Sequence, residues 1–144
     1  MKKEDIIKRL LELNYPPSEY WLVTGGAMVL YDIKESTNDI DLGCSKFLAD
    51  TLEDKGYLTA LLSDGTRRIS VADDVEIFEE WLFDKIEIRY GVPVISLKGL
   101  LEMKKGLGRE KDIEDIKLIE EVLCGQKNSS GDVRWKKLKL YIIK

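Results

Sequence analysis

The apolar run Tyr20 to Val23, followed directly by Thr24-Gly25-Gly26, constrains the fold of this chain more than any other segment. Four apolar residues are too few for a helix, and such a run is typical of a strand that is buried on both faces. The two glycines end this strand, and Ala27 to Ile33 then suits a short helix. The segment therefore predicts a buried strand that passes through glycines into a helix.

The expected order along the chain is helix, strand, helix, strand, helix, then several strands, and then two helices. Ser45 is a good N-cap for the helix that follows it, and Gly56 a good C-terminal stop. This order predicts an α/β (α+β) sandwich with a mixed β-sheet, flanking helices and C-terminal helices. Helices are expected at Lys3 to Leu13 and Ser45 to Lys55. Two more are expected near the C-terminal end, where one helix face each would carry Leu97, Leu100, Leu101 and Lys104, and Ile113, Ile116, Ile119 and Val122. The further strands are expected at Asn38 to Leu42, Tyr57 to Leu62, Arg68 to Ala72, Val75 to Phe78 and Ile86 to Tyr90.

Charge is distributed unevenly along the chain. From Lys127 to Lys144 there are six basic residues and one acid, so this segment has a charge of +5, although the whole chain has a net charge of −4. The linker-like stretch Gly125 to Gly131 precedes most of it, so we expect one domain at 1–125 and a basic C-terminal tail at 126–144. With Trp135 and Tyr141, this tail could contact RNA or a protein partner. A solvated last strand or helix is the simpler reading.

Composition excludes several chemistries. The chain has no histidine, which excludes Ser-His and Cys-His nucleophiles and His-ligated zinc. Any metal would bind carboxylates, which favours Mg²⁺ or Mn²⁺. No apolar run is long enough for a membrane span, and the acidic pair Glu4-Asp5 argues against a signal peptide. We therefore expect a cytoplasmic protein that does not bind membranes, with Cys44 and Cys124 as free thiols.

The chemistry is concentrated between Thr24 and Asp41. Glycines next to a helix start let a phosphate approach the backbone closely, although a tight turn alone would also explain Gly25-Gly26. Asp39 and Asp41 are two residues apart in a predicted strand, so both carboxylates face one side. No cation lies between them in the local sequence, and a divalent metal would relieve their repulsion. A solvent-facing strand that happens to carry two aspartates is the alternative.

The arrangement Gly25-Gly26, twelve residues, then Asp39-Ile40-Asp41 resembles the signature of the DNA polymerase β-like nucleotidyltransferase superfamily. The longer form looks like the small bacterial branch with AbiEii-type toxins and minimal nucleotidyltransferases. A second stretch, Lys104 and Arg109-Glu-Lys-Asp112-x-x-Asp115, is similar to a helical region of those proteins. The likeness spans about residues 20–123.

The resemblance implies a role for each matching residue. Gly25 and Gly26 would contact the triphosphate, with Thr24 as the neighbouring hydroxyl, while Asp39 and Asp41 would bind the metal. Lys104 would reach a phosphate or the acceptor, and Arg109 and Asp112 would belong to the distal nucleotide site. From its position alone, Lys104 could equally be a snorkelling surface lysine. Arg109 and Asp112 could be ordinary helix pairing.

The family usually supplies a third carboxylate from a neighbouring strand. Glu76 is the best candidate, because Val75 and Ile77 would face the core and leave Glu76 on the open side. Asp74 shares that side, and Glu87 is a third option. We expect Glu76 to complete the catalytic and metal-binding set with Asp39, Asp41 and Lys104.

The expected function is that of a magnesium-dependent nucleotidyltransferase, which would transfer a nucleoside monophosphate from ATP or another NTP to an unidentified small molecule, protein or RNA. A homodimer mate or the basic tail would complete the acceptor site. The alternative is a non-catalytic protein of the same fold that binds a nucleotide or a partner, as in a toxin–antitoxin or phage-defence pair. An acid beside Asp39 and Asp41 discriminates between the two.

Overall fold

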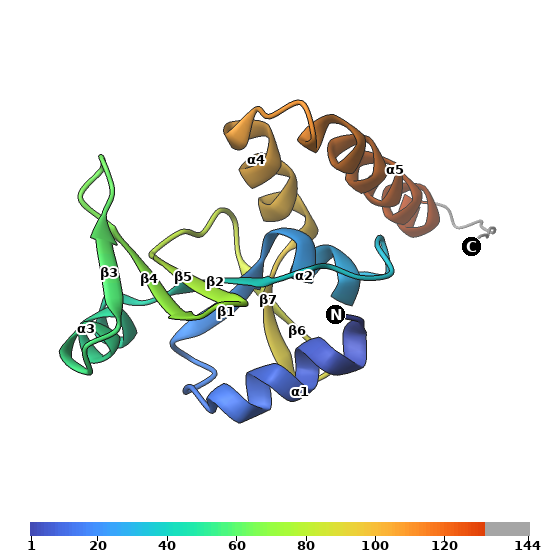
Figure 1. Ribbon diagram of the computed structural model, residues 1–144. Helices are drawn as coiled ribbons and strands as arrows, with labels where there is room; N and C mark the ends of the chain where they lie inside the picture. Colours follow the sequence, from blue (N-terminus) through green and yellow to red (C-terminus); the bar gives the residue numbers. More distant parts are fainter. Residues whose placement is uncertain (132–144) are drawn as a thin grey trace. The chain divides into compact units, whose positions relative to one another are not determined.

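The computed structural model describes residues 1–131, which include a seven-stranded mixed sheet and five helices (Figure 1). The strand order is β3-β4-β5-β2-β1-β7-β6. The predicted combination of a mixed sheet and flanking helices is thereby confirmed. The elements are α1 (Lys3–Leu13), β1 (Tyr20–Val23), α2 (Thr24–Leu30), β2 (Ile40–Cys44), α3 (Lys46–Asp54), β3 (Leu58–Leu61), β4 (Arg67–Ala72), β5 (Val75–Glu79), β6 (Ile86–Arg89), β7 (Val92–Ile95), α4 (Leu97–Leu107) and α5 (Asp112–Gly131).

Strand β1 has the predicted bounds, and all four of its residues are buried. It lies inside the sheet, antiparallel to β2 on one side and parallel to β7 on the other. An interior strand covered on both faces buries every side chain, which explains why its sequence is continuously apolar.

Next to β1, one predicted segment differs from the structure, and one strand of the structure was not predicted. Helix α2 begins at Thr24 and ends at Leu30, so the glycines lie in its first turn and do not precede it. Thr24 has φ 52°, an unusual value for a β-branched residue. Strand β7 has no counterpart among the predicted elements, because Pro93 interrupts a short apolar run and argues against a strand.

The β3–β4–β5 part of the sheet is tied to α3 by one arginine. Ser45 caps α3 as predicted, since its hydroxyl accepts a hydrogen bond from the Leu48 amide. Arg67 of β4 donates to Glu79 of β5 and to the helix carboxylates Asp50 and Glu53. Hydrogen bonds from Arg67 hold the pKa of Glu79 below its usual value. This network fixes the position of the strands that carry the site described below.

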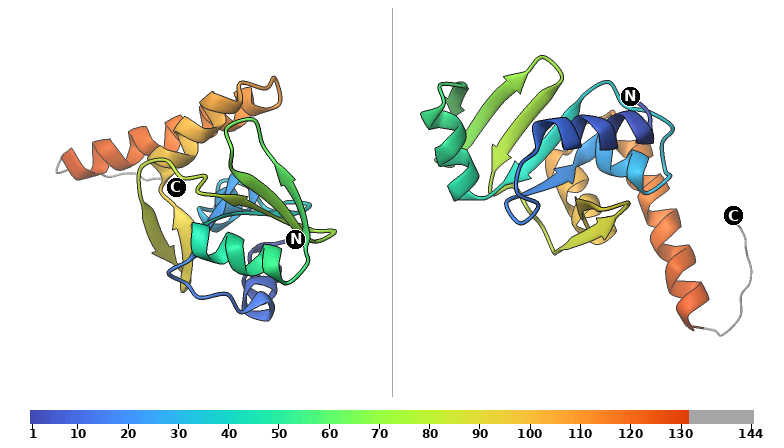
Figure 2. Two further views of the ribbon diagram at one scale, coloured as in Figure 1. Left: turned by 90° about the vertical axis from the view of Figure 1, so that its left-hand side faces the viewer. Right: turned by 90° about the horizontal axis from the view of Figure 1, so that it is seen from below.

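The chain divides into two compact units, Met1–Met103 and the residues from Lys104 onward. In the second unit α5 is one continuous helix to Gly131 (Figure 2), so the linker predicted at Gly125 to Gly131 is wrong. The predicted basic tail begins within this helix, and its residues 132–144 lie outside the described part of the chain. None of the described helices combines the length and apolar character that crossing a membrane requires.

Candidate functional site

The parallel pairing of β2 with β5 brings two acidic side chains together. Asp41 is the register partner of Glu76, and on the next strand Ser70 is the register partner of Glu76. Register partners place their side chains on the same face of a sheet, so these three residues form a row. The next residues along β2 and β5, Leu42 and Ile77, are fully buried on the other face. The predicted alternation, and the position of Glu76 on the strand next to Asp41, are confirmed.

This row opens into a cavity of about 480 Å³. Asp39 lines it together with Asp41 and Glu76. Asp39 nevertheless lies just before β2, so the strand predicted at Asn38 to Leu42 begins too early, and the strand period does not set the side of Asp39. The turn between β4 and β5 adds two further carboxyl groups. Of the described residues, none that lines the cavity is lysine or arginine, so its own lining is strongly acidic. The lining residues are Asp39, Ile40, Asp41, Leu58, Ser70, Ala72, Asp73, Asp74 and Glu76.

Two hydroxyl groups orient the paired carboxylates. The Thr24 hydroxyl donates to Oδ2 of Asp41 at 2.9 Å, and the Ser70 hydroxyl donates to Oε2 of Glu76 at 3.4 Å. Arg68 Nε lies 4.0 Å from the same Glu76 oxygen, with both side chains largely exposed. Ser70 and Arg68 cannot be recognised as site residues from the sequence, because only the pairing of β4 with β5 brings them to this face.

The topology also decides between the three candidates for a third carboxylate. Asp74 lines the cavity, but Arg9 of α1 donates to both of its carboxylate oxygens at 3.0 Å. These hydrogen bonds keep the pKa of Asp74 below its usual value. Glu87 lies on β6, which is separated from β2 by β1 and β7. Glu76 is therefore the only one of the three that stands beside Asp41 without a bidentate arginine.

The donor set has the chemistry of a site for a hard divalent ion, because carboxylate and hydroxyl oxygens are the ligands that Mg²⁺ and Mn²⁺ prefer. Within residues 1–131, however, no three acidic or thiol side chains are gathered closely enough to form a metal-binding group as they stand. An ion bound by Asp39, Asp41 and Glu76 would therefore require these side chains to move toward it.

The two glycines of the motif lie close to other side chains. A β-carbon on Gly26 would stand 2.9 Å from Leu22 Cδ1, inside normal contact distance, because α2 packs directly on β1. On Gly25 it would stand 2.6 Å from the Thr37 hydroxyl oxygen. Packing against the buried Leu22 therefore favours glycine at position 26, whereas the contact at position 25 is with the end of a partly exposed side chain that can move. Contact of either glycine with a triphosphate stays a prediction.

Thr24 offers a test in which stability and metal affinity should change independently. Thr24→Gly removes the hydroxyl that holds Asp41 but suits the positive φ, so thermal stability should not fall. If Asp41 binds Mn²⁺, the lost orientation should weaken affinity about tenfold, whereas Thr24→Ser should retain it. Calorimetric titration and thermal unfolding measure the two quantities. Equal Mn²⁺ affinities for the glycine and serine variants would show that the hydroxyl does not matter.

The remaining predicted residues form a separate buried cluster in the second unit. Lys104 is only 4% exposed, so the snorkelling interpretation is wrong. Its Nζ lies 3.3 Å from Asp112 Oδ1 and 3.1 Å from Asp115 Oδ2. Arg109 also holds Asp112, with Nε 2.7 Å from Oδ2. Hydrogen bonds from Arg109, and then from Lys104, lower the pKa of Asp112 to about 2.

Helix α5 is oriented by this cluster and not by its isoleucines alone. Ile113, expected on the buried stripe, is 59% exposed, while Asp112 is fully buried. The three-residue spacing of Asp112 and Asp115 places both on one helix face, and this spacing could have identified Asp115 as a partner of Lys104. The cluster links α4 to α5 through charge pairing, and no role in nucleotide binding follows from it.

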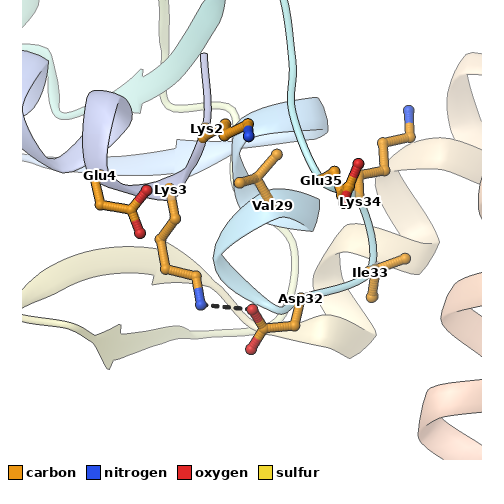
Figure 3. A pocket seen from close by; sticks show the side chains of 8 residues that line it. All are labelled: Lys2, Lys3, Glu4, Val29, Asp32, Ile33, Lys34 and Glu35. Carbon is orange, nitrogen blue, oxygen red and sulfur yellow. Dashed lines mark hydrogen bonds and ion pairs between the residues drawn. The ribbon is translucent and has the colours of Figure 1, made fainter.

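A second cavity, of about 310 Å³, lies between the start of α1 and the segment after α2 (Figure 3). Lys3 points toward Asp32 there and pairs with it at 2.5 Å. Three lysines and three acids share the lining, so this cavity has no net charge that would select an anion. The lining residues are Lys2, Lys3, Glu4, Val29, Asp32, Ile33, Lys34 and Glu35.

Comparisons with known proteins do not place this chain in a family. No protein-family model matches the sequence, and neither a curated protein nor a solved structure matches it. Function must therefore be argued from the site itself.

Proposed function

We propose that this protein is a magnesium-dependent nucleotidyltransferase, which transfers a nucleoside monophosphate from an NTP to an acceptor that is still to be identified. One observation carries the proposal: the parallel register of β2 and β5 sets Glu76 beside Asp41, at an acidic cavity that Asp39 also lines. The resemblance of Gly25-Gly26 and Asp39-Ile40-Asp41 to the superfamily signature supports the same reaction.

In the proposed reaction Asp39, Asp41 and Glu76 would be the oxygen ligands of Mg²⁺. The ion would neutralise charge on the phosphates as the bond to the leaving pyrophosphate breaks. The protein's own contribution is positioning: Thr24 holds Asp41, and Ser70 holds Glu76. This chemistry needs no histidine, so the composition is no obstacle. Hydroxyl groups of a small molecule, a protein or an RNA end are all suitable acceptors.

Glu76→Gln should abolish nucleotide transfer while leaving NTP binding largely in place. Glutamine keeps the size of the side chain and an oxygen that can accept from Ser70, but it lacks the charge that matters most in the transition state. The assay is incubation with Mg²⁺ and each labelled NTP, followed by detection of labelled protein, labelled RNA or released pyrophosphate. Glu80→Gln is a matched control, because Glu80 is exposed and does not line the cavity.

A second candidate is a non-catalytic protein of the same fold that binds a nucleotide or a partner protein, as in a toxin–antitoxin pair. Two observations favour it: within residues 1–131 no carboxylates are gathered as a metal-binding group, and Glu76 already has Ser70 and Arg68 as neighbours. NTP binding without transfer to any acceptor class, unchanged by Glu76→Gln, would support this candidate over the enzyme.

A further inference from the structure

Strand β6 forms one edge of the sheet and exposes apolar side chains. Ile88 is 67% exposed and Ile86 39%, and Tyr90, in the turn that follows, is 52% exposed. Exposed edge strands can pair with another chain, and proteins often protect them with charged side chains or proline. Strand β6 has the sequence Ile-Glu-Ile-Arg, and its two charged residues, Glu87 and Arg89, are of opposite sign. A second copy can therefore match their charges.

The pairing of β6 with β7 shows which backbone groups of β6 point outward. Ile88 is opposite Pro93, which has no N–H, so this is a non-hydrogen-bonded pair. At the end of the ladder the Ser96 amide donates to the Lys85 carbonyl at 2.8 Å. Because the two kinds of pair alternate, Glu87 and Arg89 bond to β7. The N–H and C=O groups of Ile86 and Ile88 therefore point away from the sheet.

Several antiparallel registers would let a second copy of β6 use these outward groups. Centring the pair on Ile86 would set Glu87 opposite Lys85. It would, however, place Ile88 opposite Asp84, which lies outside β6 and has φ 65°. One register places Ile86 opposite Ile88 of the second copy, and it sets Glu87 opposite Glu87. Another places Ile88 opposite Tyr90, and it sets Arg89 opposite Arg89. Both oppose like charges, which destabilises a strand pair. With Ile88 opposite Ile88, Glu87 instead lies opposite Arg89 on both sides of the two-fold axis.

We propose that two copies of this chain pair through β6, antiparallel, with Ile88 of each copy on the two-fold axis. The interface is isologous, and each copy contributes one Glu87 and one Arg89 to two equivalent ion pairs. These ion pairs occupy non-hydrogen-bonded positions, where opposing side chains lie closest.

The structure already holds both charged side chains in place. Arg89 Nε donates to the Leu30 carbonyl at 3.1 Å, and its guanidinium lies over the Tyr31 ring. Glu87 accepts from the Tyr31 hydroxyl at 3.4 Å. Ordered side chains lose little further freedom on pairing. Since β1 and β7 separate β6 from β2, the dimer is independent of the proposed carboxylate site.

Sedimentation and light scattering of the full chain over a range of concentrations test the proposal. A concentration-dependent dimer is expected, and Ile88→Lys should raise its dissociation constant about a hundredfold, because one buried isoleucine is lost from each copy. The matched control is Leu61→Lys on β3, the other edge, where Leu61 is 76% exposed. A chain that is monomeric at all concentrations overturns the proposal, and so does a dimer that Leu61→Lys disrupts and Ile88→Lys does not.

Two further variants test the register. Glu87→Arg and Arg89→Glu should each weaken the dimer, and the double variant should restore it, since the swapped charges again oppose each other. Ile88→Cys, in a Cys124→Ser background, should form a disulfide-linked dimer on mild oxidation, because hydrogen-bonded partners have Cα atoms about 5.5 Å apart. Thermal unfolding confirms that each variant is folded. Failure of both the charge swap and the cross-link, with the variants folded, overturns this register.

Discussion

Asp41→Asn is expected to lower kcat/KM for nucleotide transfer about a thousandfold, because one of the charges that would hold the ion in the transition state is lost. The change should leave the fold intact, since an asparagine oxygen can still accept the hydrogen bond from Thr24. Calorimetric titration with Mn²⁺, with and without NTP, gives an independent readout. The double variant Asp39→Asn/Asp41→Asn should bind no Mn²⁺ at this site.

Asp73→Asn is the matched control for this prediction. Asp73 lines the same cavity and is exposed, but it lies in the turn between β4 and β5 and is not on β2 or β5. Its loss removes the same charge from the cavity without removing a proposed ligand. Equal losses of Mn²⁺ affinity in Asp41→Asn and Asp73→Asn would show that only the general acidity of the cavity attracts the ion.

Lys104→Met should destabilise the α4–α5 segment by about 3–5 kcal/mol, because it removes the buried cation that Asp112 and Asp115 share. Hydrogen exchange of the α4 and α5 amides, together with urea unfolding, measures this effect. Lys105→Met is the control: Lys105 and its partner Glu120 are both about half exposed, so the loss should be about 0–1 kcal/mol. If Lys104→Met were as stable as wild type and had lost NTP affinity, Lys104 would be assigned to the nucleotide site.

The same cluster predicts an acid limit to stability. The pKa of Asp112 is lowered in the folded protein to about 2, so its contribution is complete above the ordinary carboxyl pKa, about 4. That contribution is lost as the pH falls from about 4 toward 2, where the folded protein takes up the proton. Without Lys104 the lowering is smaller, so the stability of Lys104→Met should vary less over this pH range.

Segments whose sequence pattern has one structural solution were predicted well. Tyr20–Val23 is a buried strand because an interior strand needs apolar residues at every position. Ser45 caps α3 because its hydroxyl satisfies a local amide. Strand β7 was not predicted, because proline has no N–H and usually argues against a strand. Pro93 is tolerated because it forms a non-hydrogen-bonded pair with Ile88, and only the pairing of β6 with β7 shows this.

The sequence by itself determined that Asp41 and Glu76 alternate with core residues, because both lie in strands with a two-residue period. Asp39 lies just before β2, so only the cavity that both residues line relates it to Asp41. The sequence left Glu76, Asp74 and Glu87 as alternatives. The tertiary structure decided between them: the parallel register brought Glu76 beside Asp41, Arg9 engaged Asp74, and two strands separated Glu87 from β2. Lys104 shows the same division. Its inward direction follows from its position on the apolar stripe of its own helix, but its contacts with Asp112 and Asp115 depend on how α5 packs against α4. Strand periodicity acts over neighbouring residues, but the order and register of strands depend on contacts between distant parts of the chain.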